Sequence, residues 1–186
     1  MFGLDRGEEL YRRYLEGEEG AFDQIMAEYR YRLIFFIHEI IRDADAAEDV
    51  AMDVFCYLLM HPKRYRFGTK LSTYLFMLAK SRAIDYLRHR DRFQWVSTED
   101  ETVELTNEKT LEETVLENEI KRTVHSALIH LPNEMRQVVH LVYFENRSYK
   151  DTALIMKKSP KQIDNLLFRA KEKLRNVLGK EGEELL

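Results

Sequence analysis

The sequence predicts an all-α protein of two small helical domains joined by an acidic linker. Apolar residues recur at helical spacing along most of the 186 residues, and long runs of alternating apolar and polar residues, typical of strands, are missing. Seven glycines and three prolines leave room for long helices, and hydrophobic residues make up 45% of the chain, enough for real cores. We place the first domain in residues 1–92, the linker in residues 93–114 and the second domain in residues 115–186.

The net charge of −4 averages over segments of opposite sign. Residues 60–92 hold nine Lys or Arg against two Asp, and residues 120–186 hold thirteen bases against eight acids. Residues 1–59 have six bases against fourteen acids, and residues 93–119 have one base against nine acids. Two basic surfaces separated by acidic segments indicate that one chain makes two contacts with anionic partners.

Hydrophobic spacing predicts four helices in the first domain. The first ends near Gly17, and the third ends at His61 because the residue before a proline is pushed out of helical geometry. Ser72 is the expected N-cap of the fourth helix, which follows a loop around Gly68. The expected ranges are 8–15, 20–42, 46–60 and 72–90.

The stretch 63–92 combines basic residues with five aromatic residues, Tyr65, Phe67, Tyr74, Phe76 and Tyr86. Cations attract a phosphate backbone, and flat rings offer faces on which exposed bases stack. This combination indicates single-stranded or melted nucleic acid rather than plain duplex. The alternative is an amphipathic helix with a solvated basic face and aromatic core residues. Helical spacing predicts an inward stripe and leaves Lys80, Arg82 and Arg88 outside. The stripe consists of Leu75, Leu78, Ala79, Ala83 and Leu87.

The third helix carries an acidic face, since Asp49 and Asp53 are four residues apart. We interpret it as a docking face for a basic partner. A metal or acid–base site that includes Glu48 is the alternative, but no His lies at ligand spacing. We therefore expect no catalytic residue, metal or cofactor. The single cysteine, Cys56, lies in an apolar stretch and is expected to be a buried small hydrophobe in a reducing cytoplasm.

The second domain begins with a predicted helix over residues 115–131, and Pro132 suits the first turn of the next one. Ser148 is expected to cap a short helix that ends near Met156. Ser159, Pro160 and Gln162 then form a capping box that opens another helix. A short helix, a tight turn and a capped helix make a helix-turn-helix, which reads bases in the major groove. The candidate readers are Lys161, Gln162, Asn165, Phe168 and Arg169. An ordinary helical hairpin with a basic rim is the alternative.

No apolar run approaches the roughly 20 residues of a membrane span, and the first ten residues lack a secretory-signal pattern. We therefore expect no membrane insertion and a cytoplasmic location.

Both halves, in this order, resemble the sigma factors of bacterial RNA polymerase, of the compact extracytoplasmic-function (ECF) type. Residues 47–55 (AEDVAMDVF) are similar to the family's AEDLVQEVF segment, and STYL with AKSRAIDYLR in residues 72–88 to its STWLYRIARNxAIDYLR helix. In the second half, LP at 131–132, SY at 148–149 and FRAKEKL at 168–174 match its LP…SYxEIA…RAREKL pattern. Met52, Tyr74 and Ser81 stand where the family usually has Gln, Trp and Asn.

The resemblance implies a promoter-specificity subunit with no chemistry of its own. It implies that the third helix docks on core RNA polymerase through Asp49, Met52 and Asp53. It implies that the minus-10 promoter element is recognised and held open by Lys63, Tyr65, Arg66, Phe67, Lys70, Tyr74, Lys80, Ser81 and Arg88. It implies that duplex minus-35 DNA is read by Lys158, Lys161, Gln162, Asn165, Phe168 and Arg169. The acidic linker would thread the polymerase's channels, and an anti-sigma factor is a further implied partner.

One rival interpretation is a one-component helix-turn-helix transcription regulator that binds duplex DNA without polymerase. It predicts footprinting by the isolated protein, and it leaves the basic and aromatic stretch 63–92 unexplained. An enzyme that uses Glu48, Asp49 and Asp53 with a metal ion is the second rival, for which the sequence offers neither a Gly-rich phosphate loop nor a His/Cys ligand set.

Overall fold

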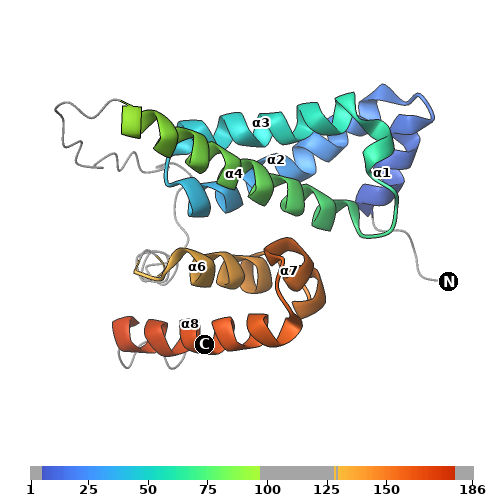
Figure 1. Ribbon diagram of the computed structural model, residues 1–186. Helices are drawn as coiled ribbons and strands as arrows, with labels where there is room; N and C mark the ends of the chain where they lie inside the picture. Colours follow the sequence, from blue (N-terminus) through green and yellow to red (C-terminus); the bar gives the residue numbers. More distant parts are fainter. Residues whose placement is uncertain (1–5, 97–127, 129, 179–186) are drawn as a thin grey trace, which may run out of the picture. The chain divides into compact units, whose positions relative to one another are not determined.

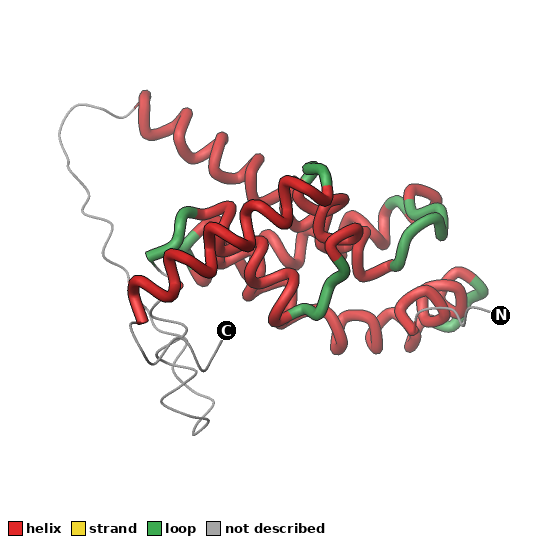
Figure 2. Tube along the Cα trace, turned by 90° about the horizontal axis from the view of Figure 1, so that it is seen from below, coloured by secondary structure: helices red, strands yellow, loops and turns green. Residues whose placement is uncertain are grey.

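The computed structural model describes residues 6–96, 128 and 130–178, and this part of the chain contains helices and loops (Figures 1 and 2). The chain divides into two compact units, Met1–Glu108 (unit 1) and Lys109–Leu186 (unit 2). The prediction of an all-α fold is confirmed. No helix in the described ranges is both long and apolar enough to cross a membrane.

Unit 1 is built from four α-helices, with a short 3-10 turn before the last. The elements are α1 (Arg6–Leu15), α2 (Glu19–Ile41), α3 (Ala44–Met60), η1 (Pro62–Arg64) and α4 (Leu71–Val96). Helices α2, α3 and α4 pack against one another, and α1 packs against α2 and α4 (Figure 1). Ring pairs join them across the core: the Phe36 and Phe76 centroids lie 5.1 Å apart, and those of Phe22 and Phe55 lie 6.4 Å apart.

The connection from α2 to α3 takes only two residues. Arg42 adopts the left-handed conformation (φ 62°), and its backbone N–H donates to the His38 carbonyl oxygen. Asp43 then caps α3, accepting a 3.0 Å hydrogen bond from the Ala46 N–H. This cap starts α3 two residues before its predicted beginning and turns the chain sharply between the two helices.

Helix α4 differs from its prediction at both ends. It begins at Leu71, and the Tyr74 N–H donates to the Lys70 carbonyl oxygen. Ser72 is a buried residue within the first turn, so its prediction as N-cap is wrong. The helix also continues to Val96, beyond the predicted end near residue 90.

Unit 2 contains α6 (Asn133–Val139), a π-helical segment η2 (His140–Phe144), α7 (Tyr149–Met156) and α8 (Pro160–Leu178). The helix predicted for residues 115–131 lies mostly outside the described residues, as does most of the predicted linker 93–114. Helix α8 packs against both α6 and α7. Its buried residues fall at helical spacing and line the core of the unit: Ile163, Leu167, Ala170 and Leu174.

Candidate nucleic-acid interface

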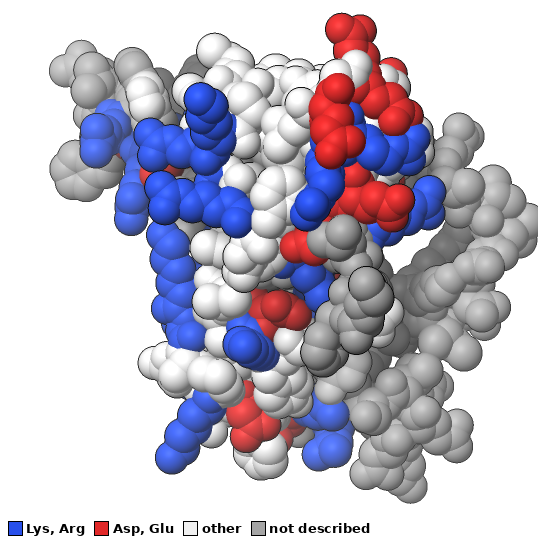
Figure 3. Space-filling view, turned by 90° about the vertical axis from the view of Figure 1, so that its right-hand side faces the viewer, with Lys and Arg blue, Asp and Glu red and all other residues white. Residues whose placement is uncertain are grey.

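The loop between α3 and α4 carries a cluster of exposed cations. Four basic side chains within eight residues are exposed there: Lys63, Arg64, Arg66 and Lys70. In Figure 3, where the end of unit 1 that carries α1 and η1 faces the viewer, Lys and Arg gather in one area and Asp and Glu in another. Residues 63–70 therefore form a basic surface able to approach phosphates, which we call the basic loop. Arg64 was missing from the predicted contacts, although its position between Lys63 and Arg66 was a sufficient signal.

Tyr65 lies inside the basic loop rather than on its surface, with only 4% of the side chain exposed. Its hydroxyl lies 2.6 Å from the Thr69 carbonyl oxygen and 3.0 Å from Glu8 Oε1 of α1. Phe76 is also fully buried. The prediction that these two rings are among those on which bases stack is therefore wrong: they face the core, because α1 and α2 supply apolar surfaces for them.

Phe67, Tyr74 and Tyr86 are the aromatic residues of the stretch 63–92 that remain partly exposed. Phe67 has a positive φ of 54°, which is rare for a bulky residue. The Arg12 guanidinium lies over its ring, 5.2 Å from the centroid. Burial raises the pKa of the Tyr74 hydroxyl above its usual value, so this side chain stays neutral at ordinary pH. The Phe67 and Tyr74 side chains are both partly exposed, within or close to the basic loop in sequence.

Further along α4, the residues predicted to contact DNA differ in how exposed they are. Arg88 is exposed and lies 3.6 Å from Asp85, while Ser81 is half-buried. Lys80 is only 9% exposed, so the prediction that it lies on the outer face is wrong. Residues 79, 80 and 83 share the buried side of the helix, because neighbouring helices cover a wider arc of α4 than one apolar stripe indicates.

The predicted docking residues Asp49, Met52 and Asp53 are all exposed on α3. Cys56, one turn further along, is also exposed, so its prediction as a buried residue is wrong. It falls on the solvent side of α3 even though its sequence neighbours are apolar. Glu48 pairs with Arg30 of α2. Within the described ranges no three His, Cys, Asp or Glu side chains come together as a metal site.

The two helices α7 and α8 of unit 2 are connected by a tight turn, and local side chains cap both. Ser148 Oγ accepts from the Asp151 N–H at 3.0 Å to start α7. Lys157 ends α7 in the left-handed conformation (φ 55°). The Gln162 N–H then donates to Ser159 Oγ at 3.2 Å, and the Ser159 N–H donates to Gln162 Oε1 at 2.8 Å. The predicted capping box is thus confirmed, and it sets the direction of α8.

Five predicted readers project from the first three turns of α8, and all are exposed: Lys161, Gln162, Asn165, Phe168 and Arg169. Phe168 is 62% exposed, a large apolar surface to leave in water. The sixth predicted residue, Lys158, lies in the turn and is occupied in an ion pair, with Nζ 2.9 Å from Glu134 Oε1. The exposed face of α8 therefore offers hydrogen-bond donors, acceptors and one apolar ring to a groove.

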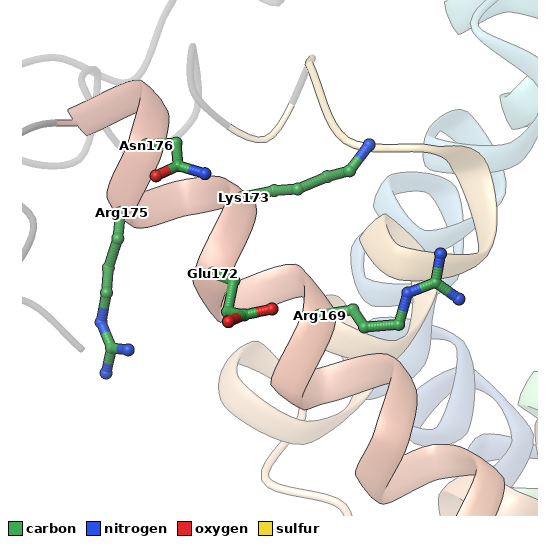
Figure 4. Close-up of a pocket in the computed structure, with 5 residues that line it drawn as sticks. All are labelled: Arg169, Glu172, Lys173, Arg175 and Asn176. Carbon is green, nitrogen blue, oxygen red and sulfur yellow. The ribbon is translucent and has the colours of Figure 1, made fainter.

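The basic side of α8 continues past the predicted readers. Figure 4 shows a shallow hollow lined by Arg169, Glu172, Lys173, Arg175 and Asn176, with Arg169 and Lys173 extending from one side of the helix and Arg175 from the other. Lys173 lies four residues after Arg169 and was missing from the prediction, although helical spacing was a sufficient signal. Cations placed beyond the reading turns suit phosphate contacts better than base contacts.

Two family models match the chain. The family described as Sigma-70 region 2 matches residues 25–93, and the family described as Sigma-70, region 4 matches residues 121–174. The first covers most of unit 1, including the basic loop, and the second covers the helix-turn-helix of unit 2.

Curated relatives match over nearly the whole chain. The chain is 28% identical to the RNA polymerase sigma-H factor of Pseudomonas aeruginosa, over 96% of each protein. It is 26% identical to the ECF RNA polymerase sigma factor SigM of Bacillus subtilis, over 82% of this chain and 92% of the relative.

Among solved structures, the fold is similar to the sigma factor RpoE of Bartonella quintana in complex with the anti-sigma factor NepR. The TM-score is 0.69 at 20% identity, covering 86% of this chain and 97% of the other. It is also similar to CnrH in complex with the cytosolic domain of CnrY, with a TM-score of 0.66 at 19% identity, covering 94% and 97%. These similarities confirm the predicted fold.

Proposed function

Since the chain belongs to the ECF type of the sigma-70 family of RNA polymerase sigma factors, we propose that its two units recognise two promoter elements on one core RNA polymerase. Unit 1 docks on the polymerase, recognises the minus-10 element and holds it open. Unit 2 binds the minus-35 element as duplex. The protein works in the cytoplasm, where core polymerase and promoter DNA meet, and residues 93–114 link the two units.

The observation that carries this proposal is the helix-turn-helix of unit 2. Its capping box is complete, and the first three turns of α8 present Gln162, Asn165 and Arg169 to solvent, with Gln162 Oε1 also accepting from the Ser159 N–H in the box. Gln and Asn pair bidentately with adenine and Arg with guanine, each pair contributing about 1–3 kcal/mol of discrimination. We assign base readout to these residues, and phosphate contacts to Lys158, Lys161, Lys173 and Arg175. Phe168 supplies apolar contact, for example to a thymine methyl group.

In unit 1 the exposed residues of the predicted minus-10 set are the proposed DNA contacts. Lys63, Arg66, Lys70 and Arg88 approach phosphates, and Arg64 joins them. The partly exposed side chains of Phe67, Tyr74 and Ser81 face bases drawn out of the stack, where aromatic stacking offsets part of the unstacking cost. Tyr65 and Lys80 are too buried to contact DNA, and they support this surface from within.

Asp49, Met52 and Asp53 form the proposed contact with core polymerase. Two carboxylates around one exposed thioether suit a partner surface that is basic at its rim and apolar at its centre. The acidic surface of α1 to α3 would also repel free DNA, so that docking on the polymerase precedes promoter binding. Once docked, the second DNA contact becomes effectively intramolecular, and neither unit needs to bind tightly alone.

An anti-sigma factor is the further partner that we propose. The structures of RpoE and CnrH contain anti-sigma factor NepR and the cytosolic domain of CnrY, respectively. A similar partner for this chain would cover the surfaces that otherwise contact polymerase.

Transcription by a reconstituted holoenzyme tests the proposal. Core RNA polymerase with and without this protein is given a library of templates with randomised upstream sequence, and the transcribed templates are sequenced. We expect two enriched sequence elements separated by a constant spacing, present only in the mixture. Identical products from core polymerase alone would overturn the proposal. Footprinting by the isolated protein at the same sequences would instead favour the one-component regulator.

Two matched substitutions assign the elements to the units. Asn165→Ala removes a proposed reader, whereas Asn176→Ala changes an exposed asparagine about three turns further along the same helix. We expect N165A to relax selection at one base pair of the upstream element by about tenfold, and N176A to leave selection unchanged. Likewise Asp53→Asn should weaken affinity for core polymerase, and Asp23→Asn, an exposed site on α2, should not.

A further inference from the structure

Helix α1 precedes residues 25–93, which match the region 2 family, yet its side chains contact the basic loop. The Tyr11 side chain is fully buried, and its hydroxyl lies 3.3 Å from the Leu58 carbonyl oxygen and 3.2 Å from that of Pro62. The Leu58 carbonyl lies near the end of α3, and the Pro62 carbonyl lies in η1, immediately before the basic loop. Tyr11 thus fixes where the chain leaves α3.

Glu8 of α1 makes the second polar contact. Its Oε1 lies 3.0 Å from the Tyr65 hydroxyl, which also lies 2.6 Å from the Thr69 carbonyl oxygen. Tyr65 therefore connects the two ends of the basic loop to each other and to α1. A buried hydroxyl that lost these acceptors would leave its hydrogen-bonding capacity unsatisfied.

Arg12 makes the third contact, above the residue with the unusual backbone. Phe67 keeps its left-handed conformation while its ring packs against Tyr11 and Tyr65, with centroids 6.2 and 4.9 Å away, and against the Arg12 guanidinium. A bulky residue persists in that conformation only where its surroundings hold it. Two of the three groups around this ring, Tyr11 and Arg12, come from α1.

Helix α1 is itself anchored independently of these contacts. A Cβ at Gly7 would lie 2.6 Å from the Tyr29 hydroxyl oxygen and 3.4 Å from Leu71 Cβ, so only glycine allows α1 to approach α2 and α4 this closely. Leu10 is buried as well. Removing one hydroxyl or carboxylate that faces the basic loop therefore leaves the attachment of α1 in place.

We propose that α1 is a positioning element for minus-10 recognition. Glu8, Tyr11 and Arg12 hold the basic loop, and Phe67 above all, in the conformation that presents it to the opened strand, without touching DNA themselves. The inference rests on the proposed function of unit 1. It assigns specificity to a helix that precedes the residues matched by the family.

The test measures base preference with intact protein on core polymerase. Templates come from the library selected with the wild-type protein, each then carrying one substitution in the downstream or the upstream element. The double variant Tyr11→Phe with Glu8→Ala removes both polar ties but keeps the ring. Because the basic loop then loses hydrogen bonds that help to fix its conformation, we expect roughly a three- to tenfold loss of preference at the downstream element. Preference at the upstream element and affinity for core polymerase should stay at wild-type values.

Conservative variants separate positioning from a general structural role. The single variant Glu8→Gln, with Tyr11 intact, keeps an acceptor oxygen for the Tyr65 hydroxyl. It should keep most of the wild-type base preference at the downstream element. Arg12→Lys keeps a cation over Phe67 and should behave as wild type, whereas Arg12→Gln should lose preference. Tyr14→Phe is the matched control, because the Tyr14 ring contacts Tyr11 and Phe22 rather than the basic loop.

Hydrogen exchange supplies a second readout. Amides of residues 63–70 should exchange faster in the double variant while those of α2 and α3 keep their protection. Unchanged downstream preference in the double variant, or equal losses at both elements, would overturn the inference. If wild-type protein selects no downstream element at all, the proposed function fails instead, so the two failures are distinguishable.

Discussion

The two candidate DNA-contacting surfaces differ in what holds them. In unit 1 the end of α3, η1 and the basic loop are joined to α1 by hydrogen bonds between residues 47, 51 and 57 positions apart. In unit 2 the caps of α7 and α8 join residues only three positions apart. The loop depends on a neighbouring helix for its shape, whereas each helix of the helix-turn-helix carries its own cap. Damage to distant contacts should therefore affect the first surface and leave the second intact.

The largest expected effect comes from Tyr11→Ala, which deletes a fully buried ring from unit 1. Truncation of a buried aromatic residue costs about 3–5 kcal/mol, and the two carbonyls also lose their donor. Regional hydrogen exchange and urea unfolding of the full chain should show loss of protection in α1, the basic loop and α3. Leu15→Ala, at an exposed site on α1, is the control. Equal loss of protection in α8 would contradict the claim that the two surfaces are stabilised independently.

A pH titration probes the burial of the Tyr11 hydroxyl without removing the ring. Burial raises the pKa of the Tyr11 hydroxyl from 10.0 to about 12 in the folded chain. The unfolded chain releases this proton first, so the contribution is fully present below pH 10 and is lost as pH rises from 10 to 12. The loss is on the order of 2 kcal/mol. Urea unfolding of wild type and Tyr11→Phe should show a shallower alkaline decline in the variant; parallel declines would contradict the assignment.

A smaller effect is expected from the local cap of unit 2. Ser159→Ala removes the acceptor for the Gln162 N–H and should cost about 1 kcal/mol. Exchange of the first-turn amides of α8 should accelerate while unit 1 stays unchanged, and Ser159→Thr should keep most of the protection. Slower transcription through loss of minus-35 contacts would accompany the fraying. Faster exchange in the basic loop of unit 1 would show that the two surfaces are coupled.

The smallest effect tests a longer-range tie in unit 2, the ion pair between Lys158 and Glu134. Glu134 is exposed, so Glu134→Gln should cost roughly 0.2–1 kcal/mol, and less at high salt. Unfolding at low and high ionic strength measures this difference. A cost greater than that of Ser159→Ala would mean that unit 2, like unit 1, relies on distant partners.

This difference explains how far the sequence could predict each site. The capping box, the turn and the exposed readers of α8 were all predictable, because Ser159 and Gln162 signal their bond within four residues. The predictions for Tyr65, Lys80 and Cys56 failed, since each depends on which surfaces neighbouring helices cover. Periodicity identified Leu75 and Ala79 as inward-facing but could not measure the width of the buried arc. The ties from Glu8 and Tyr11 had no signal in the sequence at all.

By itself the sequence determined most of the helices, the caps of α7 and α8, the helix-turn-helix and the alternation of acidic and basic segments, because these depend on contacts within about one helical turn or on charge alone. The tertiary structure decided which aromatic and basic residues of the stretch 63–92 reach solvent. Helix α1, more than fifty positions earlier, contacts both residues: Glu8 accepts from the Tyr65 hydroxyl, and Arg12 lies over the Phe67 ring. Only folding brings those groups within bonding distance.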